Sequence, residues 1–324
     1  MVSSDDAELV VSSVVIVDFV KGHMGGDEII LLDGRQIPKR YNPMSARDAL
    51  KPPNIRGREV GLLYPPQEGG DIRVKIYELT PPGPTPMCGG LTQVLGKALG
   101  ETNLARRFSI RLKKPRNIVR LETDAGVIPI QIIFRAHEET VMKVKTGMKS
   151  YVRSCYEWGR EESDLDDIPA ERVGEYYFID WGILTRKYPG VDFTRSSREC
   201  LEVIDKLRAK KNLEKMYAVV KKTGEPGHID VAFRFVPPDA LALEGEEFAC
   251  GTGSTTTAVY EVFHNRLPID SKGRGHLTVR LLNRGALPVD QRTEVDVEVR
   301  NGRVIDAWFS HNYVRMIAEG KVTI

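Results

Sequence analysis

The sequence predicts an α/β protein, of the α+β kind, built from two related lobes, and three observations support this. The chain has 324 residues, which is enough for two domains of ~100 to 200 residues each. Its apolar periodicity indicates many short strands and only a few helices. A unit of cysteine, glycine and helix also occurs twice, about half a chain apart, as MCGGLTQVLGKAL and ACGTGSTTTAVYEV.

Short strands are expected where β-branched or alternating apolar residues lie between Gly and Pro clusters. The clearest such segments in the first third of the chain are residues 14–19, 28–32 and 72–77. Basic and apolar residues also alternate over residues 107–113, which predicts a strand with one solvated face. These segments indicate that sheet dominates the fold.

Two hairpins and a final strand complete the predicted sheets. The first hairpin covers residues 117–134 around Asp124-Ala125-Gly126, where glycine can adopt the positive φ of a tight turn. The second turns at Asn301-Gly302, a strong two-residue turn signal, between alternating apolar residues on either side. Residues 320–324 form the last predicted strand.

Three helices are predicted, and two of them follow a cysteine. From Leu91 onward, apolar residues recur at three-and-four spacing immediately after Cys88-Gly89-Gly90. A second helix covers residues 196–211, where Ser196 and Glu199 have the spacing of a capping box. The third begins after Gly251-Thr252-Gly253, directly behind Cys250. Each lobe would therefore place one cysteine at the start of a helix.

Composition narrows the class of partner. The chain has 47 Lys plus Arg against 45 Asp plus Glu, a formal net charge of +2, which gives no overall bias toward nucleic acid or an anionic membrane. No apolar stretch approaches the ~20 residues of a membrane span, and the acidic N-terminus does not resemble a secretory signal. We expect a cytoplasmic protein that binds a small molecule and that binds neither nucleic acid nor a membrane. The sequence does not fix the oligomeric state, and a homodimer is one option.

The four cysteines lack the regular spacing of a disulfide framework or a zinc site. They are expected to be free thiols, and no metal or cofactor is predicted. A thiol at a helix N-terminus faces unpaired N–H groups and the positive end of the helix dipole, which favour thiolate and lower the thiol pKa. The same termini hold anions, so the N–H groups of five residues could bind a substrate carboxylate: Gly89, Gly90, Gly251, Thr252 and Gly253.

If the two termini converge on one amino acid, a sulfur would lie on each side of its Cα. One sulfur would remove the α-proton and the other would return a proton to the opposite face. The N–H groups around the carboxylate would stabilise the carbanion as an enediolate. Cys88 and Cys250 are the predicted catalytic residues. The alternative is that both are buried structural thiols, as free cysteines often are.

The sequence resembles the proline racemase and hydroxyproline epimerase family, within the wider diaminopimelate-epimerase-like fold. The resemblance covers almost the whole chain and rests on five segments and one histidine: Asp18 with Gly22-His23-Met24-Gly25-Gly26-Asp27, then Pro86-Met87-Cys88-Gly89, Leu121-Glu122-Thr123-Asp124-Ala125-Gly126, Tyr177-Phe178-Ile179-Asp180, His228, and Cys250-Gly251-Thr252-Gly253.

The resemblance implies two pseudo-symmetric lobes, each a mostly antiparallel sheet wrapped around a central helix. Residues 1–150 would carry Cys88 and residues 151–309 would carry Cys250, while a C-terminal strand at about 310–324 returns to the first lobe. Glu246 stands where proline racemases carry an Asp that holds the substrate amine, so it is expected to do the same. His23 and His228 fall where the family places polar pocket groups, although a lone histidine is more often structural.

Departures from the family pattern bear on the substrate. Proline racemases follow the first Cys-Gly with a histidine that contacts the ring nitrogen, and here that position is Gly90. The arginine that diaminopimelate epimerases place before the second cysteine has no counterpart in Leu241-Ala242-Leu243. The resemblance therefore favours neither plain proline nor a substrate with a distal carboxylate. Two other functions stay open: a lyase or isomerase of the same fold, such as a hydroxyproline dehydratase, and a non-catalytic amino-acid binder.

Overall fold

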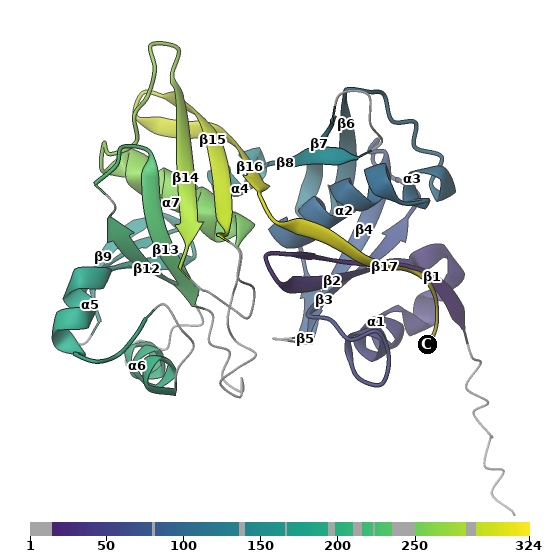
Figure 1. The fold of residues 1–324 in the computed structure, drawn as a ribbon, viewed down its shortest axis with the longest axis horizontal. Coiled ribbons are helices and arrows are strands. Elements are labelled where there is room, and N and C mark those ends of the chain that lie inside the picture. The colour runs from purple at the N-terminus through teal and green to yellow at the C-terminus, as the bar shows by residue number, and fades with distance from the viewer. Residues whose placement is uncertain are drawn as a thin grey trace, which may run out of the picture.

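The computed structural model describes residues 15–79, 82–135, 140–165, 167–193, 198–209, 216–222, 224–234, 250–282 and 290–324. It is a mixed α/β structure in which strands outnumber helices, so the predicted fold class is confirmed. Figure 1 shows two groups of strands, one around helix α2 and one around helix α7. Glu246 lies outside the described residues.

The first half of the chain contains eight of the described strands and three α-helices. They are β1 (Ile16–Met24), β2 (Asp27–Asp33), α1 (Asn42–Leu50), β3 (Glu59–Tyr64), β4 (Ile72–Leu79), β5 (Pro82–Thr85), α2 (Gly89–Glu101), α3 (Leu104–Arg107), β6 (Arg116–Thr123), β7 (Gly126–Phe134) and β8 (Val141–Gly147), with two short 3₁₀ segments, η1 (Gly34–Gln36) and η2 (Lys39–Tyr41).

The second half repeats this mixture of short strands and helices. Its elements are α4 (Lys149–Trp158), β9 (Arg160–Asp164), β10 (Pro169–Val173), β11 (Tyr176–Asp180), α5 (Trp181–Lys187), α6 (Arg198–Ala209), β12 (Met216–Lys222), β13 (His228–Arg234), α7 (Gly251–Phe263), β14 (Arg274–Leu281), β15 (Arg292–Arg300), β16 (Arg303–His311) and β17 (Val314–Thr323).

Strand pairing follows the same pattern in both groups. In the first, β17, β1 and β2 are antiparallel neighbours, a parallel step leads to β3 and β4, and another leads to β6, β7 and β8. In the second, β9, β10 and β11 are antiparallel, and parallel steps lead to β12 and β13 and then to β14, β15 and β16. The repeat gives each cysteine-bearing helix an equivalent sheet around it.

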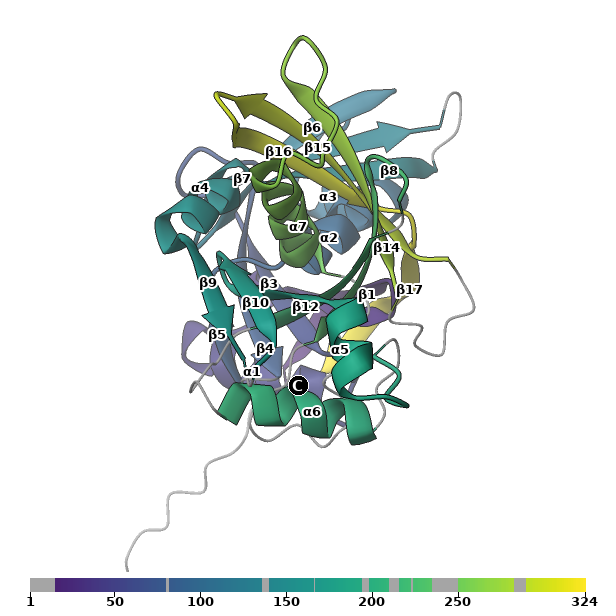
Figure 2. The same ribbon diagram turned by 90° about the vertical axis from the view of Figure 1, so that its left-hand side faces the viewer.

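The two groups meet where β16 pairs with β8, with Phe309 opposite Thr146. The chain then crosses to the first group, where β17 lies antiparallel to β1 over its whole length. Figure 2 shows α7 with α2 behind it, inside the surrounding strands. The division of the chain near residue 150 stays a prediction.

Helices α2 and α7 are almost completely buried. Leu91, Val94, Leu95 and Ala98 of α2 have no exposed surface, and Ala258 and Val259 of α7 have none either. These apolar residues recur at helical spacing and join one hydrophobic core that extends over both groups. The predicted helix positions are confirmed, and burial on nearly all sides explains why so few polar residues occur in α2.

Both predicted hairpins are present, and two other sequence-based expectations are wrong. The hairpins are β6 with β7 and β15 with β16. Residues 107–113 do not form a strand, because α3 ends at Arg107 and Ser109 takes a positive φ of 58° that leaves the extended region. Cys155, expected in an ordinary polar segment, is 1% exposed on α4.

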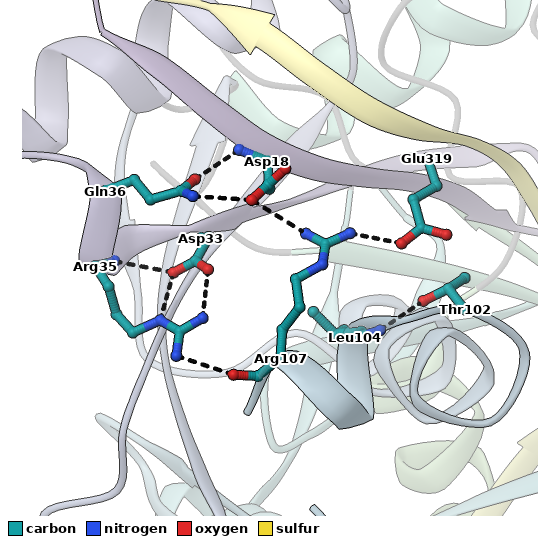
Figure 3. A network of polar contacts seen from close by, with 8 residues as sticks. All are labelled: Asp18, Asp33, Arg35, Gln36, Thr102, Leu104, Arg107 and Glu319. Atoms are coloured by element: carbon teal, nitrogen blue, oxygen red, sulfur yellow. Dashed lines mark hydrogen bonds and ion pairs between the residues drawn. The ribbon is translucent and has the colours of Figure 1, made fainter. Parts of the chain in front are cut away.

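Arg107 instead joins a network of charged residues that fastens β1, β17 and α3 together (Figure 3). Its guanidinium Nη2 lies 2.5 Å from Glu319 Oε1, and Nη1 lies 4.0 Å from Asp18 Oδ2. Arg35 binds Asp33 and donates to the Arg107 carbonyl oxygen at 3.0 Å. Asp18, one of the residues that carry the family resemblance, therefore has a structural position in this network.

None of the helices in the described part of the chain combines the length and the apolarity needed to cross a lipid bilayer.

Candidate active site

Cys88 and Cys250 occupy the same position on two equivalent helices. Each is the N-cap residue, with extended backbone angles of −131° and 124° for Cys88 and −124° and 113° for Cys250. In each case the sulfur accepts a hydrogen bond from the N–H three residues later, from Leu91 at 3.2 Å and from Gly253 at 3.3 Å. Thiols thus do here what Ser or Asp side chains usually do at helix N-termini.

The two helix N-termini touch each other. A Cβ atom added to Gly89 would lie 3.1 Å from the Gly251 Cα, so the first turns of α2 and α7 are in direct contact. Phe309 packs against both, because its Cζ would lie 3.1 Å from a Cβ at Gly89 and 2.5 Å from one at Gly251. Glycine is needed at both positions for this close approach. The structure therefore brings the two predicted cysteine loops together.

Cys88 lies in an acidic environment. Cys88 is 8% exposed, and the Glu59 side chain at the start of β3 is one of the acidic groups that act on its thiol. Burial, followed by the negative charges of Glu59 and Asp27, raises the pKa of this thiol well above its usual value, although the Leu91 N–H opposes the shift. The expectation that the helix terminus lowers the thiol pKa is wrong for Cys88, because desolvation and acids outweigh it.

Three carboxylates lie close to one another behind Cys88. Glu59 is directly opposite Glu78 in the antiparallel pair of β3 and β4. Burial, with the charge of Asp27 adding to it, raises the pKa of Glu78 to about 7. Burial also raises the pKa of Asp27, although Arg58 Nε lies 3.5 Å from Asp27 Oδ1 and works against this. Further negative charge is therefore disfavoured beside this cysteine.

Gly90 is surrounded on the side where a side chain would extend. A Cβ atom there would lie 3.1 Å from Ile29 Cδ1, 3.4 Å from Asp27 Oδ2 and 3.5 Å from Met24 Cε. The Cβ of a histidine at this position, as proline racemases have it, would be in tight contact with the Ile29 side chain and would touch the Asp27 carboxylate.

Two hydroxyl groups, those of Tyr176 and Thr252, lie beside Cys250. The Tyr176 hydroxyl lies 3.0 Å from Cys250 Sγ and 2.9 Å from Thr252 Oγ1. Thr252 Oγ1 is itself 3.3 Å from the sulfur. Tyr176 is fully buried at the start of β11, and its ring lies edge-on to Phe233 at 5.8 Å. Cys250, at 4% exposure, is thus held by one N–H group and two hydroxyls.

The predicted carboxylate-binding residues fall into two groups. Helix geometry leaves the N–H groups of Gly89, Gly90, Gly251 and Thr252 without acceptors inside their helices, so they are placed to bind an anion. The Gly253 N–H is already donated to Cys250 Sγ. A Cβ at Gly253 would also lie 2.6 Å from the Phe233 ring. Gly253 therefore holds the cysteine and allows close packing, and its role in substrate binding stays a prediction.

The two predicted histidines lie in different places. His23 is half-buried near the end of β1, where Nδ1 accepts a hydrogen bond from the Gly26 N–H at 3.1 Å and burial lowers its pKa. The next residue along is Met24, which lies against Gly90. His228 is exposed and its ring contacts the Pro226 carbonyl at 3.3 Å and Glu225 at 3.4 Å.

His228 also begins β13 at the end away from the cysteine. Phe233, which packs on Gly253, is five residues further along this strand, roughly 16 Å away at ~3.3 Å per residue. His228 is thus exposed at the start of β13, and its role in substrate binding stays a prediction.

Sequence reasoning missed three residues of this site: Glu59, Tyr176 and Phe309. None carries a local motif. Tyr176 immediately precedes the Tyr177-Phe178-Ile179-Asp180 segment, which was the nearest available signal. Each reaches the site through strand pairing between distant parts of the chain, and such pairing is not visible in one sequence.

The remaining cysteines are free and buried in the core. Cys200 packs with Leu207 of α6, as its spacing predicts. Cys155 lies 3.7 Å from Thr256 Oγ1, and burial raises its pKa to about 12. Among the described residues, no group of three or more His, Cys, Asp or Glu side chains is arranged to hold a metal ion.

No protein-family model matches the chain, and no curated protein matches it by sequence. Solved structures match it over nearly its whole length. A hydroxyproline epimerase from Agrobacterium vitis with bound trans-4-OH-L-proline is 14% identical, and the match covers 95% of this chain and 91% of that one at a TM-score of 0.62. A probable proline racemase from Agrobacterium radiobacter with bound carbonate is 15% identical, with 94% and 92% covered and a TM-score of 0.63.

A methylitaconate-delta-isomerase is similar to the same extent. It is 13% identical, and the match covers 97% of this chain and 96% of that one at a TM-score of 0.63. Identities this low establish a shared fold. The chain has the fold of the racemase, epimerase and isomerase structures that it matches, as the resemblance in its sequence implied.

Proposed function

We propose that this protein is a cofactor-independent amino-acid racemase or epimerase in which Cys88 and Cys250 exchange protons with opposite faces of the substrate Cα. One observation carries the proposal: two helices, each capped by a cysteine, meet at their N-termini through Gly89 and Gly251. A carbon atom held at this meeting point would face one sulfur on each side. The fold shared with a hydroxyproline epimerase and a probable proline racemase supports the same chemistry.

The substrate carboxylate would bind the N–H groups that begin the two helices. Both helices direct the positive ends of their dipoles at the same place, which favours an anion there. When the α-proton leaves, the electron pair of the C–H bond moves into the carboxylate, which becomes an enediolate. The same N–H groups would stabilise this added charge in a site that excludes most water, as oxyanion-binding groups do.

After one turnover the two cysteines would have exchanged their protonation states. One cysteine, as the thiolate, takes the α-proton and becomes a thiol. The other, as the thiol, gives its proton to the opposite face of Cα and becomes the thiolate. Cys88, whose pKa is raised by burial and by Glu59, suits the thiol role in the ligand-free state. Glu246 would hold the substrate amine, as the family resemblance implies.

The surroundings of Gly90 support a substrate other than plain proline. The histidine of proline racemases is absent, and Ile29 and Asp27 fill the space beside the glycine. The carboxylates behind Cys88 also oppose a second carboxylate in the substrate, since like charges in a buried site repel. A monocarboxylic amino acid, with a primary amine or a modified ring, fits this site best.

Deuterium exchange tests the proposal. Enantiopure amino acids would be incubated with the protein in deuterated water, and α-deuterium and inversion would be followed by NMR and chiral chromatography. We expect both for at least one amino acid. Cys88→Ser and Cys250→Ser should each lower inversion by about 10²- to 10⁴-fold, the usual contribution of one acid or base. Cys200→Ala, at a buried cysteine remote from the site, is the matched control and should keep full activity.

A panel of amino acids with neither deuterium incorporation nor inversion would sink the racemase proposal. The methylitaconate-delta-isomerase match makes a proton-shifting isomerase of unsaturated acids the second candidate. That candidate predicts exchange without inversion and a change in ultraviolet absorbance as the double bond moves. A binder without catalysis would show a ligand-dependent rise in Tm with no exchange, and at least one cysteine variant would keep its affinity.

A further inference from the structure

We infer that His311 and Gln291 hold the side chain of the substrate, and that this side chain ends in a neutral group that donates and accepts hydrogen bonds, such as a hydroxyl or a primary amide. The inference rests on the proposed amino-acid racemase or epimerase and names the class of amino acid that it takes. Both residues would determine specificity, and neither would take part in the proton transfer.

His311 and Gln291 lie on one face of the sheet that β15 and β16 form against α7 (Figure 2). In this antiparallel pair His311 is opposite Thr293, and Phe309 lies two residues before His311. Gln291 lies two residues before Thr293, and these four side chains are buried, whereas Arg292 between them is exposed. Successive side chains of a strand alternate between its faces, so the four buried ones share the face toward α7.

This face extends past the N-terminus of α7. At the C-terminal end of the helix, Phe263 lies edge-on to Tyr156 at 5.3 Å, and the Tyr156 hydroxyl accepts the Val304 N–H at 2.8 Å. At the other end, Phe309 packs on the first turn. β16 therefore runs from the C-terminal end of α7 toward its N-terminus, and His311 lies beyond that terminus, roughly 7 Å further along the strand than Phe309.

His311 also lies beside the first turns of α2. The Gln93 side chain, one turn after Gly89, accepts the His311 N–H at 3.3 Å and donates to the Phe309 carbonyl oxygen at 3.4 Å. His311 is thus next to the point where the two helix N-termini meet, and the substrate Cα is proposed to lie there. A substrate side chain directed along β16 would reach His311 from that point.

Both side chains have hydrogen-bonding atoms that no described residue satisfies. His311 Nδ1 lies 3.1 Å from Thr293 Oγ1, but Nε2 has no partner, and neither the oxygen nor the nitrogen of the Gln291 carboxamide has one. His311 is 7% exposed and Gln291 is 2% exposed. Buried polar atoms normally have hydrogen-bond partners, because leaving them without one costs free energy. These atoms are therefore placed to bind a polar ligand group.

The chemistry of the two residues favours a neutral group. Burial, with the charge of His23 adding to it, lowers the pKa of His311 to about 3, so the ring is uncharged near neutral pH. A carboxamide is uncharged as well, and it offers both a donor and an acceptor. An ionised ligand group would be buried here without an opposite charge, which is costly. The two residues are diagonal neighbours, ~7 to 8 Å apart, so one hydroxyl or amide can reach both side chains.

The test compares amino acids that differ by one polar group. The pairs are trans-4-hydroxy-L-proline with L-proline, L-serine with L-alanine, and L-asparagine with L-leucine. Binding would be measured by isothermal titration calorimetry and α-deuterium exchange by NMR. We expect the polar member of at least one pair to bind about ten-fold more tightly, the size of one good hydrogen bond, and to exchange faster.

Volume-matched variants assign this preference to the two residues. Gln291→Met removes the carboxamide, and His311→Asn retains a polar group toward Thr293 but loses the one at Nε2. Each should reduce the preference to about two-fold and leave the apolar member of the pair unchanged. His311→Gln returns an amide near the Nε2 position and should restore part of the preference. Asn42→Leu is the matched control, at a buried carboxamide on α1 whose oxygen also lacks a partner among the described residues, and it should keep the full preference.

The inference is overturned if no polar member binds more tightly than its apolar partner, or if the preference survives in Gln291→Met and His311→Asn. Variants that weaken both members of a pair alike would also overturn it, since that pattern indicates a structural role or ordered water only. The two His311 variants decide the question if Gln291→Met does not fold.

Binding does not require turnover, so this inference and the proposed function can fail separately. Deuterium exchange without any preference for a polar side chain would keep the racemase and remove the inference. A preference in binding that the variants abolish, together with no exchange for any amino acid, would do the reverse.

Discussion

The loops that begin α2 and α7 are alike in backbone and different in what surrounds them. Cys88 and Cys250 are both N-caps with a sulfur that accepts the N–H three residues later. The strands beside them then diverge, since β3 brings Glu59 to Cys88 and β11 brings Tyr176 to Cys250. A helix terminus alone therefore does not set the state of a thiol. Burial and neighbouring charge can outweigh the helix dipole, as they do at Cys88.

The largest effect should come from breaking the contact between the two loops. Gly251→Ala would place a methyl group 2.5 Å from the Phe309 Cζ, and this ring is fully buried and cannot move away. Overpacking of this kind costs about 3 kcal/mol of unfolding free energy at the upper end. Gly89→Ala, with its nearest contacts at 3.1 Å, should cost about 1 kcal/mol. Urea unfolding measures both.

A second-site change checks the reason for this cost. Phe309→Leu removes the ring that both methyl groups would meet, so it should recover part of the loss in Gly251→Ala. Equal losses for the two glycine variants, or no recovery with Phe309→Leu, would contradict the packing described here.

The next largest effect is a pH dependence of the unfolding free energy, which comes from the acidic residues near Cys88. The folded protein keeps the Glu78 proton up to a pKa of about 7, mainly because of burial, whereas an unfolded chain loses it near 4.5. Stability should therefore fall as the pH rises from 4.5 to 7, and the loss persists above 7. Glu78→Gln removes this dependence and should stabilise the protein at pH 8 by about 2 kcal/mol, since partial exposure reduces the full linkage value.

At pH 4 the Glu78→Gln variant and the unsubstituted protein should unfold at the same urea concentration. Glu157→Gln, on the exposed face of α4, is the control and should change stability little at either pH. A gain at pH 4 as large as that at pH 8 would mean that packing, and not the carboxyl charge, is responsible.

A smaller effect is expected on the pKa of the Cys88 thiol when one of the acidic residues near it is neutralised. Glu59→Gln removes a negative charge and a carboxylate acceptor from Cys88, so the pKa of this thiol should move down toward its usual value. Iodoacetamide alkylation of Cys88 at pH 8 should become about ten-fold faster, which corresponds to one pH unit. Glu59→Asp keeps the charge and should stay slow. An unchanged rate in Glu59→Gln would leave burial and the Asp27 charge as the causes of the raised pKa.

The smallest effect concerns the position two residues after each cysteine. This is Gly90 in the first loop and Thr252 in the second, where the side chain already contacts Tyr176. Gly90→Ala gains helix propensity but meets Ile29 at 3.1 Å, so unfolding free energy should change by no more than about 0.5 kcal/mol. Gly90→His should cost clearly more, because the larger ring must displace Ile29 or Asp27. Equal stability of the Ala and His variants would show open space at Gly90.

Periodicity predicted the elements that carry the cysteines better than the connections around them. The starts of α2 and α7 and both hairpins follow from apolar spacing and turn residues, which act over a few neighbouring residues. The strand expected at residues 107–113 is absent because α3 ends at Arg107 and Ser109 takes a positive φ, and the Arg107 side chain makes ion pairs with Asp18 and Glu319, which lie far from it in sequence. Alternation describes a strand only when a neighbouring strand is present to pair with it.

The residues of the candidate site also differ in whether they could be predicted from the sequence. The cysteines and the glycines beside them are visible in the sequence, because an N-cap and a helix terminus are local structures. Tyr176 is 74 residues from Cys250, and Phe309 is more than 200 residues from Gly89. Their contacts depend on which strands pair and in which register. His228, which the resemblance puts among the pocket groups, is exposed at the start of β13.

The sequence by itself determined that two thiols begin two glycine-rich helices and that the chain repeats one unit of fold. Only the tertiary structure decided that these helices meet at Gly89 and Gly251, and that the two thiols differ. The physical reason is that a helix terminus is built from consecutive residues, whereas the charge on a buried sulfur depends on every group packed around it. At Cys88 these groups include the Glu59 and Asp27 carboxylates, and at Cys250 they include the Tyr176 hydroxyl, all from strands remote in sequence.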